Sequence, residues 1–121
     1  MANPFVHIEL TTDNLGKAKE FYGKLFSWKL EDMPMPNGTY TMVKAEGGPG
    51  GGMMNKPSPE VPTAWLPYVE VDSVDDTVSQ ARKLGAKIMK DKTPIPEMGA
   101  FAILLDPTGG AIGVWENAKK K

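Results

Sequence analysis

The sequence contains no cysteine and only one histidine among its 121 residues. Without cysteine, a disulfide scaffold and a cysteine-ligated zinc site are excluded, and any metal site would have to use His, Asp and Glu. The charge is nearly balanced, with 14 Lys+Arg against 15 Asp+Glu and a formal net charge of -1. Because nucleic-acid and acidic-membrane binders rely on a surplus of Lys and Arg, we expect neither kind of partner.

Long hydrophobic runs are also missing. The apolar segment Phe101–Leu105 is too short to cross a bilayer, and the N-terminal residues lack the basic and apolar regions of a signal peptide. We therefore expect a cytoplasmic protein. The length predicts one domain, residues 1–121, and the basic tail Lys119-Lys120-Lys121 is expected to be a solvated end.

A strand-and-helix pattern occurs twice along the chain. The β-rich run Val6–Leu10 is followed by helix-starting side chains and then by apolar residues three and four apart, which predict an amphipathic helix over residues 15–26. The same order returns at Tyr68–Val71. There Ser73 is the predicted N-cap of the second helix, and Gly85 occupies the expected left-handed position after it.

Each predicted helix precedes three further β-type segments separated by turn signals such as Pro36-Asn37-Gly38. These segments are 28–30, 40–43 and 52–54 in the first half and 87–89, 101–105 and 112–115 in the second. The two halves, about residues 5–55 and 64–116, therefore indicate two βαβββ modules. The predicted fold class is α+β, with paired curved mixed sheets around a shared cleft.

Three segments carry a resemblance to a known family. Phe5–Leu10, the Phe21-Tyr22 pair and Asp106–Gly113 resemble the glyoxalase, bleomycin-resistance and extradiol-dioxygenase superfamily, also called vicinal oxygen chelate proteins. Trp65–Val71 and the ending 101–116 resemble its lactoylglutathione-lyase-related branch. The resemblance implies paired βαβββ modules with a ligand in the cleft between their sheets. It also implies frequent pairing between subunits, so a homodimer is expected.

The resemblance further implies where a metal would be held. Metal-using members place one ligand in the first strand and one in the last strand of each module, and the matching positions here are His7, Gly52, Leu66 and Gly113. Three of these four side chains have no donor atom, whereas a catalytic divalent ion needs about three protein ligands. We therefore expect no metal and no other cofactor. The lyase and dioxygenase chemistries that depend on such an ion should not be inherited.

Alternation along the predicted strands indicates which side chains share the cleft. The predicted ligand-binding residues are Phe5, His7, Glu9, Met54, Leu66, Tyr68, Glu70 and Trp115. Such a lining is mainly aromatic and apolar with a few polar anchors, which is typical of a site for a small organic molecule.

Each polar or aromatic candidate also has a structural interpretation. His7 titrates near neutral pH and would serve as an acid, a base or a ligand anchor, or it is a hydrogen-bonded structural histidine. Glu9 and Glu70 are either a pair of carboxylates in the cleft or each the partner of a structural hydrogen bond. Trp115 either stacks against a ligand or packs in the core.

Three classes of function remain open from the sequence. The first is a binding protein for a small organic molecule that uses no catalytic metal. The second is an enzyme, either a metal-dependent lactoylglutathione-lyase-like enzyme with ligands from other positions or a metal-free isomerase that uses His7 and Glu9 as its catalytic candidates. The third is a dimeric interaction module without a small ligand.

Overall fold

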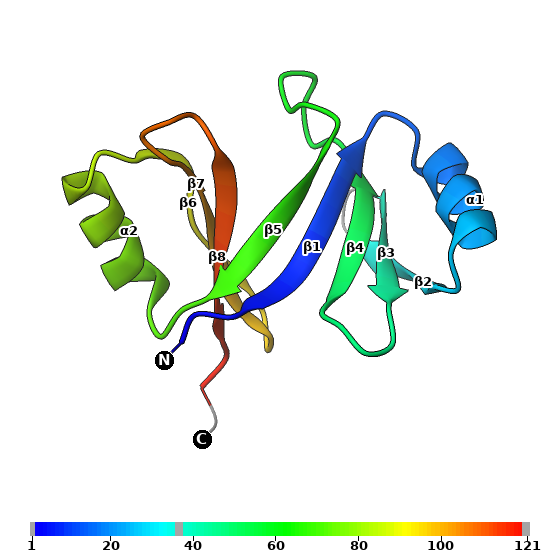
Figure 1. Cartoon of the computed structure of the whole chain (residues 1–121), viewed down its shortest axis with the longest axis horizontal. Coiled ribbons are helices and arrows are strands. Elements are labelled where there is room, and N and C mark those ends of the chain that lie inside the picture. Colours follow the sequence, from blue (N-terminus) through cyan, green and yellow to red (C-terminus); the bar gives the residue numbers. More distant parts are fainter. Residues whose placement is uncertain (1, 36–37, 120–121) are drawn as a thin grey trace. The chain divides into compact units, whose positions relative to one another are not determined.

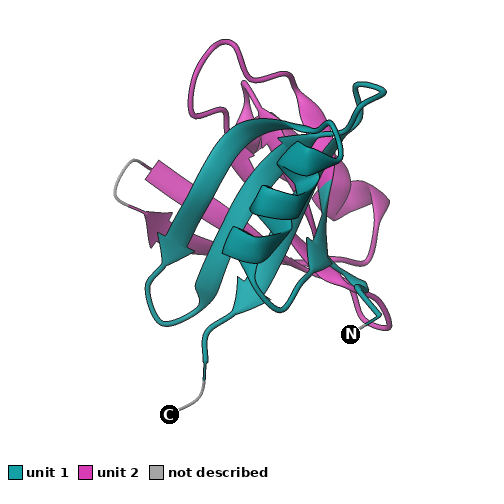
Figure 2. Cartoon of the chain, turned by 90° about the vertical axis from the view of Figure 1, so that its left-hand side faces the viewer, with its two compact units in different colours: residues 1–6, 67–121 teal, residues 7–66 magenta. Residues whose placement is uncertain are grey.

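A computed structural model describes residues 2–35 and 38–119 of the chain. Within these ranges the chain forms eight strands and two helices, so the predicted α+β class is confirmed. The predicted turn at Pro36-Asn37 and the last two lysines of the tail lie outside the described residues. The chain divides into an N-terminal unit, residues 7–66, and a C-terminal unit, residues 1–6 and 67–121 (Figure 2).

The N-terminal unit is a four-stranded mixed sheet with one helix. Its elements in chain order are β1 (Phe5–Thr12), α1 (Leu15–Leu25), β2 (Lys29–Met35), β3 (Gly38–Lys44) and β4 (Gly50–Asn55), and the first two residues of β1 belong to the other unit. The strands lie in the order β2-β3-β4-β1, with β1 parallel to β4 and the other pairs antiparallel. The helix α1 covers one face of this sheet (Figure 1), and the buried core between them contains Leu10, Leu15, Val43 and Met53.

The C-terminal unit repeats this arrangement. Its elements are β5 (Ala64–Glu70, whose first three residues belong to the N-terminal unit), α2 (Val74–Lys83), β6 (Lys87–Ile95), β7 (Gly99–Leu105) and β8 (Ala111–Asn117). The strand order is β5-β8-β7-β6, with β5 parallel to β8. The helix α2 packs on this sheet through a core of Val71, Val74, Val78, Ala102, Leu104 and Val114 (Figure 1).

The predicted ends of α2 are confirmed. The Ser73 hydroxyl accepts a hydrogen bond from the Asp76 amide at 3.1 Å, which satisfies an amide of the first turn. Gly85 follows the helix with a φ of +100°, a left-handed conformation that residues with a β-carbon rarely adopt. The side chain of Asn14 caps α1 in the same way by accepting from the Lys17 amide at 3.0 Å.

A second cap in each unit comes from the strand that pairs in parallel with the strand before the helix. Asn55, at the end of β4, accepts a hydrogen bond from the Leu15 amide through Oδ1 at 3.0 Å. Glu116, near the end of β8, accepts one from the Val74 amide through Oε1 at 2.7 Å. The first residue of each helix is thus joined to its own sheet by a hydrogen bond from its amide to a side chain far away in the sequence.

The strand β6 extends well beyond the predicted segment 87–89 and reaches Ile95. It lies at the edge of its sheet and pairs with β7 through two register shifts. Residues 89–92 and Pro94 are exposed, and three of them are charged. Such residues are typical of an edge strand and hide the alternation used for prediction. Among the described residues, neither helix is long and apolar enough to span a membrane.

Candidate functional site

The sheet of the N-terminal unit carries a polar group on the face opposite α1. Strand register places Glu9 beside Gly52 and Tyr40 beside Met54. Because paired residues project to the same face and alternate residues share a face, His7, Glu9, Tyr40, Gly52 and Met54 all lie on one side. Leu10, Val43 and Met53 project to the other side, into the core under α1.

Three side chains on this face form a hydrogen-bonded chain. The Tyr40 hydroxyl donates to Glu9 Oε2 at 2.8 Å and lies 2.7 Å from His7 Nε2. The direct distance from His7 Nε2 to Glu9 Oε2 is 4.0 Å, so the phenol lies between the imidazole and the carboxylate. The single proton of the Tyr40 hydroxyl is donated to Glu9. The hydrogen bond with His7 therefore has to be donated by Nε2, so the neutral imidazole is assigned the Nε2–H tautomer.

Burial favours the uncharged form of His7. The side chains of His7 and Glu9 are 28% and 16% exposed. Burial lowers the pKa of His7 below its ordinary value, and the neighbouring Glu9 carboxylate opposes this shift without cancelling it. At neutral pH the imidazole is therefore uncharged. It can accept a proton or a hydrogen bond without the cost of first losing a charge.

Tyr40 also fills the space above Gly52. A β-carbon built on Gly52 would overlap the hydroxyl and the outer ring carbons of Tyr40. The absence of a side chain at residue 52 is therefore what allows the phenol to reach between His7 and Glu9.

The C-terminal unit contains a second group of predicted residues. Tyr68 pairs with Gly113 and Glu70 pairs with Trp115, so these four share one face of that sheet. A β-carbon on Gly113 would overlap the Tyr68 ring, just as a β-carbon on Gly52 would overlap the Tyr40 ring. The Tyr68 ring also contacts Phe101 edge to face, with ring centroids 6.1 Å apart.

A hydrogen-bonded chain also links two of the predicted residues in this unit. Trp115 Nε1 donates to Asn117 Oδ1 at 2.9 Å, and Asn117 Nδ2 donates to Glu70 Oε2 at 3.1 Å. The structural hydrogen bond considered for Glu70 is present, and its donor is Asn117. Trp115 and Glu70 are thus held in place by one amide side chain.

The remaining predicted residues differ in exposure. Met54 is half-buried and pairs with Tyr40 on the His7 face. Leu66 is half-buried in β5, whereas Phe5, at the start of β1, is 59% exposed. Of the eight predicted residues, the structure brings His7, Glu9 and Met54 together in the N-terminal unit and Tyr68, Glu70 and Trp115 together in the C-terminal unit.

The side chains present do not fit a catalytic divalent ion. The only histidine of the sequence has its Nε2 engaged by Tyr40, and the space above Gly52 holds a phenol in place of a carboxylate. The space above Gly113 is likewise taken by the Tyr68 ring. Across residues 2–35 and 38–119, no three His, Cys, Asp or Glu side chains come together in a group that would hold a metal ion.

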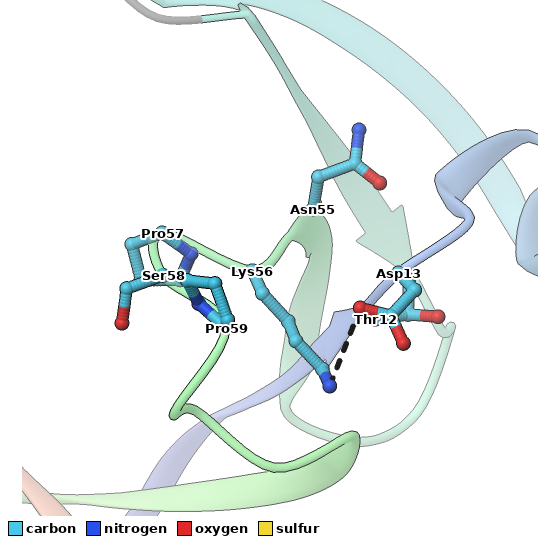
Figure 3. Close-up of a pocket in the computed structure, with 7 residues that line it drawn as sticks. All are labelled: Thr12, Asp13, Asn55, Lys56, Pro57, Ser58 and Pro59. Carbon is cyan, nitrogen blue, oxygen red and sulfur yellow. Dashed lines mark ion pairs between the residues drawn. The ribbon is translucent and has the colours of Figure 1, made fainter.

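A separate cavity of about 290 Å³ lies where β1 and β4 end, lined by Thr12, Asp13, Asn55, Lys56, Pro57, Ser58 and Pro59 (Figure 3). Within it Lys56 Nζ lies 3.3 Å from Asp13 Oδ1, and the Lys56 amide donates to the Thr12 carbonyl at 2.9 Å. Asn55 supplies the second cap of α1. The charged and polar groups of this cavity are therefore engaged in holding the loop to the strand end, and the His7 face is the stronger candidate for chemistry.

The most important site residue that the sequence prediction missed is Tyr40. The sequence places Tyr40 in a predicted strand, residues 40–43, but indicates no role for it. A usable signal was present in the glycine at position 52, because a missing side chain inside a strand often marks the close approach of another group.

The comparisons with known proteins agree with the predicted family. The sequence matches the Glyoxalase/Bleomycin resistance protein/Dioxygenase superfamily over residues 5–114. A protein of Mycobacterium bovis named "Putative glyoxylase CFP32" is 33% identical over 114 residues, which cover 90% of this chain and 44% of that protein. The chain thus spans less than half the length of this curated relative.

Two solved structures share the fold. One is the hypothetical protein BH1468 from Bacillus halodurans C-125, with a TM-score of 0.76, 15% identity and coverage of 100% of this chain and 99% of that one. The other is the methylmalonyl-CoA epimerase from Mycobacterium tuberculosis, with a TM-score of 0.71, 14% identity and coverage of 95% and 88%. The family match covers nearly the whole sequence, and this chain therefore belongs to the Glyoxalase/Bleomycin resistance protein/Dioxygenase superfamily.

Proposed function

We propose that this chain binds a small organic molecule on the His7 face of its N-terminal sheet and that binding requires no catalytic metal ion. The observation that supports this most directly is the Tyr40 hydroxyl between His7 Nε2 and Glu9 Oε2. It occupies His7 Nε2 and Glu9 Oε2, two atoms that a metal ion would need as ligands, and it gathers a neutral imidazole, a phenol and a carboxylate on one face of the sheet. The methylmalonyl-CoA epimerase among the fold neighbours acts on an organic acyl thioester, which supports a ligand of this general kind.

A thermal-shift screen tests the proposal. The probes are short carboxylic acids, ketones and coenzyme A thioesters, each added to protein that has been treated with EDTA. A ligand at 100 times its Kd stabilises the folded protein by about 2.7 kcal/mol, which is readily detected as a rise in Tm. We expect at least one probe to raise the Tm of the wild type, and to raise that of a His7→Ala variant much less. A screen without any hit, or hits that His7→Ala leaves unchanged, would contradict the proposal.

A metal-free isomerase that uses His7 and Glu9 is the second candidate, and the continuity of the hydrogen-bonded chain favours it. In such a reaction, His7 would take a proton from a carbon atom beside a carbonyl group and later return one to the ligand. The hydrogen bond from Nε2 through Tyr40 to the Glu9 carboxylate would stabilise the imidazolium formed between these steps. Incubating each screening hit in D₂O with the protein tests this: deuterium should enter at the carbon beside the carbonyl with the wild type, and not with His7→Ala.

A metal-dependent, lactoylglutathione-lyase-like activity would require donors other than the four family positions. Elemental analysis for Zn, Ni, Fe and Mn after refolding with excess metal decides this point. One tightly bound equivalent in the wild type would support the lyase and would overturn metal-independent binding.

The oligomeric state of the protein is a further part of the proposal. We propose a homodimer, supported by the family resemblance and by three exposed apolar side chains at the end of α1: Phe21, Leu25 and Phe26, which are 57%, 56% and 45% exposed. The cytoplasmic location expected from the sequence stays a prediction. Sedimentation equilibrium of the wild type and of a Leu25→Glu variant tests the dimer. We expect a dimer that the variant dissociates; a monomeric wild type would contradict it.

A further inference from the structure

We propose that Tyr40 and Gly52 together exclude a divalent metal ion from His7 and Glu9, so that the N-terminal unit holds a latent metal site that two substitutions complete. This inference rests on the proposed metal-independent function and adds its structural cause. It concerns the Tyr40–Gly52 pair, meaning the phenol of Tyr40 and the side-chain-free position beneath it.

His7, Glu9 and residue 52 lie on one face of the sheet. Residue 52 is the register partner of Glu9 on the adjacent parallel strand, and His7 lies two residues before Glu9 on the same strand. A side chain introduced at residue 52 would therefore project beside the Glu9 carboxylate and on the same side as the His7 imidazole. Three strand positions thus converge on one small region of the sheet.

The atoms of His7 and Glu9 that would bind a metal ion are already engaged by Tyr40. His7 Nε2 forms a hydrogen bond with the Tyr40 hydroxyl at 2.7 Å, and Glu9 Oε2 accepts one from the same hydroxyl at 2.8 Å. A metal ion binds a neutral imidazole through a nitrogen lone pair and a carboxylate through its oxygen lone pairs. With its hydrogen on Nε2, His7 has no lone pair directed toward this region, because the proton is shared with the phenol.

Tyr40 and a side chain at residue 52 would occupy the same space. Since even a β-carbon on Gly52 would overlap the Tyr40 phenol, a carboxylate side chain cannot enter at residue 52 while Tyr40 is present. Conversely, the phenol cannot reach His7 and Glu9 if residue 52 carries a side chain. The two positions are therefore coupled: a metal-binding arrangement requires both to change, and a change at one alone leaves it incomplete.

The double variant Tyr40→Ala/Gly52→Glu should create a site with one imidazole and two carboxylates, a donor set that suits Zn²⁺, Mn²⁺ and Co²⁺. The probes are Zn²⁺ in isothermal titration calorimetry and Co²⁺ in visible absorption spectroscopy. We expect the double variant to bind one equivalent of metal about 100-fold more tightly than the wild type, because donors held on one surface act at a high effective concentration. Adding His7→Ala to the double variant should abolish this gain.

The C-terminal unit supplies a matched control. There the Tyr68 ring covers Gly113 in the same way, yet that unit contains no histidine, since the only one in the sequence is His7. The variant Tyr68→Ala/Gly113→Glu makes the same pair of changes without an imidazole. It should not gain tight metal binding, and a gain equal to that of the first double variant would show that an added carboxylate alone explains the effect.

The single variant Tyr40→Ala tests the donor step without introducing a new side chain. It releases His7 and Glu9 from the phenol, and we expect it to bind Zn²⁺ more tightly than the wild type but more weakly than the double variant. This variant decides the matter if the double variant does not fold, as judged by circular dichroism. If folded Tyr40→Ala protein binds Zn²⁺ no better than the wild type, the proposal is wrong.

The two proposals fail in different ways. If the wild type binds an organic ligand but the folded double variant gains no metal affinity, only the role of the Tyr40–Gly52 pair is overturned. If the wild type itself binds one equivalent of metal through His7, both this inference and metal-independent binding are overturned.

Discussion

The phenol hydroxyl of Tyr40 occupies the space in which a β-carbon on Gly52 would lie. This close approach predicts that Gly52→Ala destabilises the protein by roughly 2 kcal/mol, within the range found when a methyl group is forced into occupied space. The cost arises from moving Tyr40 away from His7 and Glu9. The free energy of unfolding in urea measures it.

A double-mutant cycle isolates the contact. In a Tyr40→Ala background the added methyl group meets no phenol, so the double variant should be more stable than the sum of the single effects predicts, by at least about 0.5 kcal/mol. Gly51→Ala is the control, because its β-carbon would overlap the Ile8 carbonyl oxygen, which belongs to the backbone. Rescue of Gly51→Ala by Tyr40→Ala would show that the cycle reports general loosening rather than this contact.

The hydroxyl of Tyr40 should contribute to stability in its own right. Tyr40→Phe keeps the ring but removes the oxygen that bonds His7 Nε2 and Glu9 Oε2. Because both of these half-buried groups lose a partner and one is a carboxylate, we expect a loss of about 1–3 kcal/mol in the free energy of unfolding.

Tyr22→Phe is the matched control for this loss. The Tyr22 hydroxyl accepts one hydrogen bond from Trp65 Nε1, at 3.2 Å, and both groups of that bond are neutral. Its removal should cost less than Tyr40→Phe. Equal costs would argue that the hydrogen bonds linking His7, Tyr40 and Glu9 stabilise the protein no more than an ordinary neutral pair.

The stability of the protein should depend on pH through His7. Burial holds the pKa of His7 below its ordinary value despite the nearby Glu9 carboxylate. Below about pH 6.5 the unfolded chain binds a proton at this residue that the folded chain does not, so stability falls as the pH drops through that value toward the lowered pKa. Above about pH 6.5, His7 is neutral in both the folded and the unfolded chain, so it contributes no pH dependence to the stability.

Urea unfolding of the wild type and of His7→Gln between about pH 8 and pH 5 measures this effect. On acidification the wild type should lose more stability than the variant, which lacks the titrating group. A wild type that gains stability relative to His7→Gln would mean that attraction to Glu9 outweighs burial.

The sequence predicted those features that depend on local pattern. Alternation indicated that His7 and Glu9 share a face, and the capping residues Ser73 and Gly85 marked the ends of α2 correctly. Both follow from residues adjacent in the chain, where backbone geometry alone decides which way a side chain points. The family was also predicted correctly, from motifs spread over the whole chain.

The partners across strands could not be predicted in this way. Alternation assigns Tyr40 to a face but does not say which residue of the neighbouring strand lies beside it, because register depends on turn geometry and packing. The approach of Tyr40 to Gly52, and of Asn117 to Glu70, required the register of β3 with β4 and the folding of β8 beside β5.

The caps supplied by Asn55 and Glu116 should stabilise the starts of α1 and α2. Glu116 accepts from the amide of Val74, a residue with no exposed surface, so Glu116→Ala should leave a buried donor without this partner. We expect a loss of about 1–2 kcal/mol in the free energy of unfolding, comparable with the loss of a helix N-cap. Glu116→Gln retains an acceptor oxygen and should recover most of the lost stability.

Asn55→Ala should destabilise the protein by a similar amount, because the Leu15 amide at the start of α1 loses its acceptor, and Asn55→Asp should preserve the stability. If hydrogen exchange at the Leu15 and Val74 amides were unchanged in the two alanine variants, the helix starts would be held by packing alone.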